Sequence, residues 1–164
     1  GVFVNPSNNY IEMGIKSGID CIQLHGEESP ERCEEIRNFF KIPIIKAIPI
    51  FNELDLKGIE SYSVACDFFL FDKKNDKENG YNGGTGKSFD WNVIKNNKLW
   101  LDKQKPWILS GGLNLSNIQE AIKLTGTKAI DVSSGIEYNS GIKSRELMQL
   151  FAHEVQNIDN KVKP

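Results

Sequence analysis

Short apolar runs alternate with segments of helical spacing along the whole of this 164-residue chain. Three of the runs, residues 68–74, 107–112 and 129–135, stop at an acid or at a step rich in glycine and serine. Apolar runs of this kind are typical of parallel strands, which are buried on both faces and need polar groups only where they end. The pattern therefore predicts a parallel α/β sheet whose strand ends carry the chemistry, as expected of an enzyme.

The alternation continues through six βα units with no tandem domain break. Strands are expected at 1–5, 19–24, 42–48, 68–72, 106–110 and 128–133. Helices are expected at 10–19, 29–40, about 91–97, 114–124 and 144–155, with a weaker one at 51–64. Strict alternation favours right-handed crossovers and leaves two topologies open, a doubly wound sheet and a (β/α) barrel. Because a barrel has eight strands in about 250 residues, residues 1–164 would form one incomplete barrel domain.

Composition restricts the partners of this chain. Its net charge of −2 and apolar content of 39% are those of a globular protein, with no electrostatic case for nucleic acid or an anionic membrane. No apolar run approaches the length of a bilayer span, and no leader is visible. The three cysteines lack a C-x-x-C spacing, which indicates reduced thiols of a cytoplasmic protein and no metal site.

Asp72 is the first candidate catalytic residue. It ends the apolar run 68–72, so its carboxylate is expected at the mouth of the sheet between hydrophobic walls. Such surroundings raise the pKa of a carboxyl group and suit it to general acid catalysis. The alternative is a structural acid that caps the next helix or pairs with Lys73 or Lys74. Position alone does not separate the two interpretations.

The last two strands are followed by candidate phosphate loops, residues 110–112 and 133–135. Glycines let a backbone turn sharply and expose N–H groups, which together with hydroxyls can hold a phosphate. Ordinary turn chemistry would explain either loop alone, but two adjacent copies at the end of a barrel favour phosphate. The candidate phosphate-binding residues are Gly111, Gly112, Ser133, Ser134 and Gly135.

Three polar side chains near the predicted strand ends are candidates for substrate contact or charge pairing. His25 follows the second strand and either contacts the substrate or forms a structural hydrogen bond. Asp131 lies in the last strand, where it could hydrogen-bond a substrate amine or hydroxyl. Lys46, inside a strand, is expected to point inward or toward the mouth as a charge partner.

The segment GGTGKS at 83–88 has the appearance of a P-loop but fails the spacing test. The nucleotide motif requires a glycine five residues before Gly86, and Tyr81 occupies that position. A mobile lid over the mouth, including Gly83 and Gly84, fits this long polar loop better than nucleotide binding.

Taken together, these stretches resemble the phosphoribosylanthranilate isomerases, (β/α)8 barrels of tryptophan biosynthesis. The matching stretches are GVFVN, QLHGEE, IIKA, GGTGKSFDW, LSGGLN, AIDVSSGIE and GIKS, in the order of the family and over nearly the whole chain. The combination of GGTG-x-x-FDW with SGGL and DVSSG is specific, whereas no single piece would be. On this resemblance the six units correspond to strands three to eight of the barrel.

The resemblance implies a cofactor-free Amadori rearrangement of a phosphorylated sugar–anthranilate substrate. In such enzymes an aspartate protonates the furanose ring oxygen, and a cysteine thiolate then removes the C2 proton. Asp72 matches the acid, and the two loops match the phosphate region, with His25 and Asp131 nearby. Gly83 and Gly84, in the GGTG segment, are expected to contact the substrate as well.

The chain departs from the family at the general base. The family cysteine ends the first strand in a Lys-Val/Ile-Cys-Gly motif that is absent here, and Cys21, Cys33 and Cys66 do not sit in it. A basic residue that holds the anthranilate carboxylate is absent too. We therefore expect about two N-terminal units or a fused pathway domain outside this chain, and no turnover by the chain alone. The alternatives are a related phosphate-binding barrel enzyme and a catalytically silent remnant.

Overall fold

The computed structural model describes residues 1–74 and 88–162 and contains a five-stranded parallel sheet. Its strands are β1 (Val2–Phe3), β2 (Ile22–Leu24), β3 (Ile44–Ile50), β4 (Phe68–Lys73) and β5 (Trp107–Leu109). The strand order β1-β2-β3-β4-β5 is that of the sequence, so each strand lies beside its predecessor. A doubly wound sheet reverses its strand order at a switch point. The sequential order therefore favours the barrel-type winding of the two topologies.

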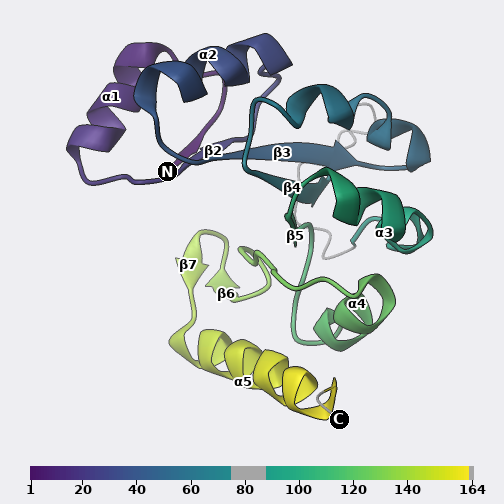
Figure 1. The fold of residues 1–164 in the computed structure, drawn as a ribbon. Helices are drawn as coiled ribbons and strands as arrows, with labels where there is room; N and C mark the ends of the chain where they lie inside the picture. Colours follow the sequence, from purple (N-terminus) through teal and green to yellow (C-terminus); the bar gives the residue numbers. More distant parts are fainter. Residues whose placement is uncertain (75–87, 163–164) are drawn as a thin grey trace.

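The helices pack along the outer side of the sheet (Figure 1), so that the strands form the inner side of an arc. They are α1 (Asn8–Lys16), α2 (Pro30–Phe40), α3 (Asn92–Gln104), α4 (Ile118–Thr125) and α5 (Arg145–Val162). The core fills the layer between sheet and helices with side chains such as Ile36, Ile44, Phe69 and Leu109, all fully buried. None of the described helices is long and apolar enough to cross a membrane.

The local signals for α2 are confirmed. The Ser29 side chain accepts a hydrogen bond from the N–H of Arg32 as the N-cap, and Pro30 occupies the first helical position. The helix ends at Lys41, which adopts a left-handed conformation. These features act within one or two turns, which is why the sequence predicts them well.

The weaker helix expected at 51–64 is wrong. The structure has two 3₁₀ helices there, η1 (Glu53–Leu56) and η2 (Ile59–Tyr62). Asn52 caps η1 through a capping box with Asp55, and Gly58 then takes a φ of +84°. A positive φ at Gly58 ends one helical turn and starts another, so a continuous α-helix cannot form.

The strand expected at 128–133 is shorter than predicted. It makes one isolated parallel bridge, between Leu109 and Ile130, so five strands rather than six form the continuous ladder. The chain then forms an unpredicted antiparallel hairpin of β6 (Glu137–Asn139) and β7 (Ile142–Lys143) before α5 (Figure 1). The bridge still places residues 129–131 beside β5.

A buried ion pair holds the loop after β2 against β3. Lys46 Nζ lies 2.9 Å from Glu28 Oε2, and the two side chains are 4% and 1% exposed. Lys46 also donates to the carbonyl of Gly26, while Glu28 accepts from the N–H groups of Asn5 and Gly26. Burial raises the pKa of Glu28, but the hydrogen bonds from Lys46 and the backbone outweigh it and the pKa lies below its ordinary value. Lys46 therefore points inward as a charge partner, as the sequence predicted, and its partner is Glu28.

Replacing one member of this pair is expected to be strongly destabilising. Lys46→Met leaves the Glu28 carboxylate buried without its cation and is expected to lower the free energy of unfolding by about 3–5 kcal/mol. Urea denaturation at neutral pH measures the loss. Lys46→Met combined with Glu28→Gln should cost less, because the charge goes with its partner.

The control is Lys16→Met, which breaks an ion pair with Glu12 whose side chains are 71% and 54% exposed. Exposed pairs contribute little, so this variant should lose less than about 1 kcal/mol. Equal losses for Lys46→Met and Lys16→Met would contradict a structural role for the buried pair.

Candidate active site

The parallel register brings the carboxyl ends of β2, β4 and β5 to one edge of the sheet. His25 follows β2, and its Nε2 atom lies 2.9 Å from Oδ2 of Asp72 in β4. The side chains are 33% and 27% exposed, so the pair is half-buried and reachable from solvent. The structure thus joins two of the residues that the sequence singled out 47 positions apart.

The structure bears on the alternative that Asp72 is a structural acid. Its Oδ1 atom accepts the N–H of Lys73 at 2.8 Å. Lys74 pairs at 2.7 Å with Asp55 of η1. Asp72 Oδ2 lies 2.9 Å from His25 Nε2, so this oxygen is hydrogen-bonded to a second titratable side chain.

The hydrogen bond to Asp72 raises the pKa of His25 above its ordinary value. Burial and the charge of Lys46 work against this shift, whereas the carboxylates of Asp72 and Asp131 support it. The pair therefore holds the imidazole proton to a higher pH than a free imidazole would.

The first glycine loop lies directly against Asp72. Gly111 and Gly112 have φ angles of +86° and +71°, which favour glycine. A Cβ on Gly111 would stand 2.5 Å from the backbone nitrogen of Lys73 and 3.1 Å from Asp72 Oδ1. The loop is fixed from its other side, because the amides of Asn114 and Asn117 both donate to the carbonyl of Gly112, at 3.1 and 2.9 Å.

The second loop packs on the first. A Cβ on Gly135 would overlap the carbonyl oxygen of Leu113, so only glycine allows this approach. Ser110 Oγ lies 3.0 Å from Asp131 Oδ2, which connects the two loops through side chains. The structure therefore brings both predicted loops, Asp131 and Asp72 to one edge of the sheet.

Two polar residues of this edge were not singled out from the sequence. Lys143 of β7 donates to the carbonyl and the hydroxyl of Ser133 and pairs with Glu137 at 2.7 Å. Gln23 of β2 lies 3.0 Å from Nδ1 of His25. The two-residue period of a strand could have indicated Gln23, because residues two apart share a face. Ser134 is exposed.

The predicted substrate contacts Gly83 and Gly84 lie outside the described residues. Within the described ranges, no group of three or more His, Cys, Asp or Glu side chains could hold a metal ion.

None of the three cysteines is placed to act at this edge. Burial raises the pKa of Cys33 to about 11 and that of Cys66 to about 12, so both thiols stay protonated at neutral pH. Cys21 directly precedes β2, at the opposite end of that strand from His25, and burial raises its pKa too. None of the three cysteines therefore supplies a thiolate at the edge where Asp72 and His25 lie.

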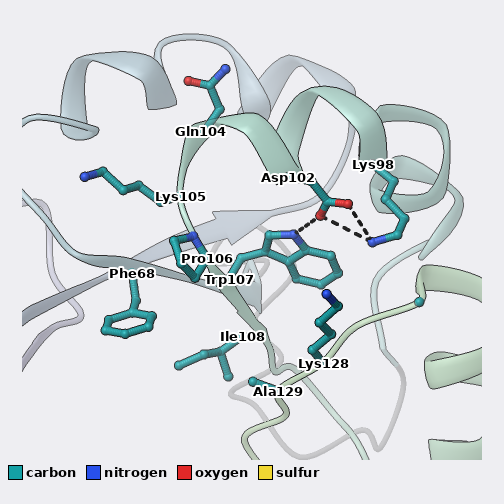
Figure 2. Close-up of a pocket in the computed structure, with 11 residues that line it drawn as sticks. Phe68, Lys98, Asp102, Gln104, Lys105, Pro106, Trp107, Ile108, Lys128 and Ala129 are labelled. Carbon is teal, nitrogen blue, oxygen red and sulfur yellow. Dashed lines mark hydrogen bonds and ion pairs between the residues drawn. The ribbon is translucent and has the colours of Figure 1, made fainter.

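A pocket of about 510 Å³ lies at the opposite edge, around the amino ends of β4 and β5 (Figure 2). Trp107 donates through Nε1 to Asp102, and Lys98 lies over the indole ring and pairs with the same carboxylate. The pocket holds none of the predicted site residues, and its one acid is already bound by two donors. We assign this network to the packing of α3 on the sheet.

The fold and the site define an α/β protein with parallel strands, a carboxylic acid and two glycine loops at their carboxyl edge. The sequence profile of the N-(5'phosphoribosyl)anthranilate (PRA) isomerase family matches residues 1–154. The chain therefore belongs to this family, whose members isomerise phosphoribosylanthranilate in tryptophan biosynthesis.

Individual relatives agree with this assignment. The N-(5'-phosphoribosyl)anthranilate isomerase of Zymomonas mobilis is 41% identical over 157 residues, which cover 95% of this chain and 72% of the relative. The crystal structure of the isomerase from Thermotoga maritima matches with a TM-score of 0.80 and 34% identity over 96% of this chain and 72% of that one. A structure of an isomerase in complex with reduced 1-(o-carboxyphenylamino)-1-deoxyribulose 5-phosphate matches at 0.76 and 30% identity, over 96% of this chain and 70% of that one.

The His25–Asp72 pair is expected to make stability depend on pH. Because the pKa of His25 is raised in the folded state, its stabilisation is complete below the unfolded value of 6.5 and is lost as the pH rises through the folded value. His25→Gln should therefore cost more unfolding free energy at about pH 5.5 than at about pH 9. Denaturant titrations at both pH values measure the difference, with His153→Gln on α5 as the control.

Proposed function

We propose that Asp72 is the general acid of the isomerisation. Asp72 would protonate the furanose ring oxygen of N-(5'-phosphoribosyl)anthranilate, so that the C1–O bond breaks and a Schiff base forms. The observation that carries this proposal is the half-buried Asp72 carboxylate, 2.9 Å from His25 and against the backbone of Gly111. A proton donor next to an anion-binding loop is the arrangement that a phosphorylated sugar requires.

We propose further that residues 110–112 and 133–135 hold the substrate phosphate. The amides of Asn114 and Asn117 hold the carbonyl of Gly112, and the N–H of Ser110 donates to the carbonyl of Phe71, so Gly111 and Gly112 would offer the N–H groups that meet an anion. Lys143 stands beside Ser133 and adds a positive charge at the second loop. His25 and Asp131 would contact the sugar portion, since His25 is hydrogen-bonded to the acid and Asp131 to Ser110 of the first loop.

We also propose how the chain corresponds to a complete barrel. Residues 1–164 would form one domain made of six consecutive βα units of a (β/α)8 barrel. The sequential parallel strand order supports it, and so does the bridge at Ile130, which stands where a sixth strand would run.

The general base of the reaction is not among the cysteines of this chain. Two thiols are buried with raised pKa values and the third lies at the other end of its strand. We therefore expect no consumption of the substrate by the 164-residue chain above that of its Asp72→Asn variant, measured by anthranilate fluorescence. Clear turnover by the chain alone would contradict our inference that the general base lies outside it.

The role of Asp72 can be tested in a protein that also carries the general base of the family. The chain is joined to an N-terminal segment that carries the Lys-Val/Ile-Cys-Gly strand of the family, and Asp72→Asn is introduced. The substitution should lower kcat at least about 100-fold and change KM little, because proton transfer is a transition-state event. His153→Asn on the outer helix is the control, and an unchanged kcat in Asp72→Asn would reject the acid.

The phosphate loop is tested by a substitution that a positive φ disfavours. Gly112→Ala strains a residue with a φ of +71° and should weaken the binding of ribose 5-phosphate at least about tenfold, measured by calorimetry. Gly18→Ala is the matched control, because Gly18 has a φ of +98° with open space around it, in the turn before β2. Equal affinities of the two variants would place the phosphate elsewhere.

A further inference from the structure

We propose that Gln23 is a positioning residue that controls which nitrogen of His25 carries a proton, and thereby whether Asp72 can be loaded with one. The proposal rests on the proposed role of Asp72 as the acid. Gln23 Nε2 lies 3.0 Å from Nδ1 of His25, and Nε2 of the same ring lies 2.9 Å from Asp72 Oδ2. The three side chains form one hydrogen-bonded row from β2 to β4.

The chemistry of the amide fixes the direction of this row. An amide nitrogen donates and an amide oxygen accepts, so the arrangement with Gln23 Nε2 toward the ring goes with an Nδ1 of His25 that carries no proton. The ring proton then sits on Nε2 and is donated to the Asp72 carboxylate. This is the state of the pair without an extra proton, in which Asp72 is an acceptor.

Protonation of Asp72 through His25 requires the other end of the same amide, its oxygen. When a proton is added, the ring carries N–H on both nitrogens, and transfer from Nε2 to Oδ2 then leaves a protonated Asp72 and a ring with its proton on Nδ1. Nδ1–H needs an acceptor, which Gln23 provides by turning its amide so that Oε1 faces the ring. Asp72 can then give its proton to the furanose oxygen. The ring still carries its proton on Nδ1, and the pair regains the first state when Nε2 takes a proton from solvent and Nδ1 releases its proton to solvent.

The backbone and the charged groups around His25 define the surroundings of its ring. Its backbone N–H donates to the carbonyl of Phe3 at 2.8 Å, which fixes the residue against β1. The charged groups that act on the ring are Asp72 from β4, Lys46 from β3 and Asp131 beside β5. The two carboxylates favour a protonated ring, whereas Lys46, which is bound by Glu28, opposes it. Gln23 is the neutral partner that can match either state.

The test is a histidine NMR titration of the 164-residue chain, which has two histidines, His25 and His153. Nitrogen-15 shifts of the imidazole report the tautomer, and His153→Asn assigns the signals. We expect the neutral ring of wild-type His25 to carry its proton on Nε2. Gln23→Met removes the amide and should allow the Nδ1–H form to appear in the spectrum.

A second variant is expected to raise the pKa of His25. Gln23→Glu places an acceptor and a negative charge permanently at Nδ1, so the pKa of His25 should rise by about one unit or more. Gln119→Glu, the same change on the exposed face of α4, should leave it unchanged. A joined, active form of the protein should show the same upward shift in its pH–rate profile.

Three results would each overturn the proposal. The first is a wild-type ring that is protonated on Nδ1. The second is a tautomer that is the same in wild type and Gln23→Met, and the third is a Gln23→Glu shift no larger than that of Gln119→Glu. Because neither reading depends on turnover, failure of the Gln23 assignment is distinct from failure of Asp72 as the acid, which the kinetics decide.

Discussion

The parallel register of β3, β4 and β5 is the constraint on which the site depends. Asp72 pairs with Pro49 of β3, and the N–H of Ser110 donates to the carbonyl of Phe71, so the glycine loop begins where the acid-bearing strand ends. A slip of one residue would turn Asp72 toward the helices and bring Lys73 to the mouth, because side chains alternate along a strand. The same alternation keeps Phe71 in the core, so packing of the apolar face fixes the position of the acid.

The loop after β2 is held by a different interaction. Lys46 and Glu28 are both buried and satisfy each other and the backbone of Gly26, so this loop has little freedom. His25 stands at the start of the same loop and meets Asp72 across β3. A buried ion pair is weak evidence for stability by itself, but here it fixes the loop that carries His25, the partner of Asp72.

The three cysteines lie away from the edge of the sheet that carries Asp72 and His25. Cys33 and Cys66 belong to the apolar layer between helices and sheet, where burial keeps their thiols protonated. The mouth instead collects carboxylates, an imidazole and glycine loops, the groups to which we assign proton donation and anion binding. Membership of the isomerase family and the absence of a thiolate at this edge are therefore compatible, provided that the base comes from residues other than these.

The sequence by itself determined what short-range physics controls: the alternation of buried strands and helices, the Ser29 cap, and an acid and glycine loops at strand ends. It failed at 51–64, where the φ of Gly58 depends on the turn it joins, and it did not indicate the β6–β7 hairpin. Only the tertiary structure decided that His25 reaches Asp72, that Gln23 orients His25, and which strand order the alternation takes. These contacts join residues far apart in the chain, and their geometry follows from strand register and core packing, which no local pattern encodes.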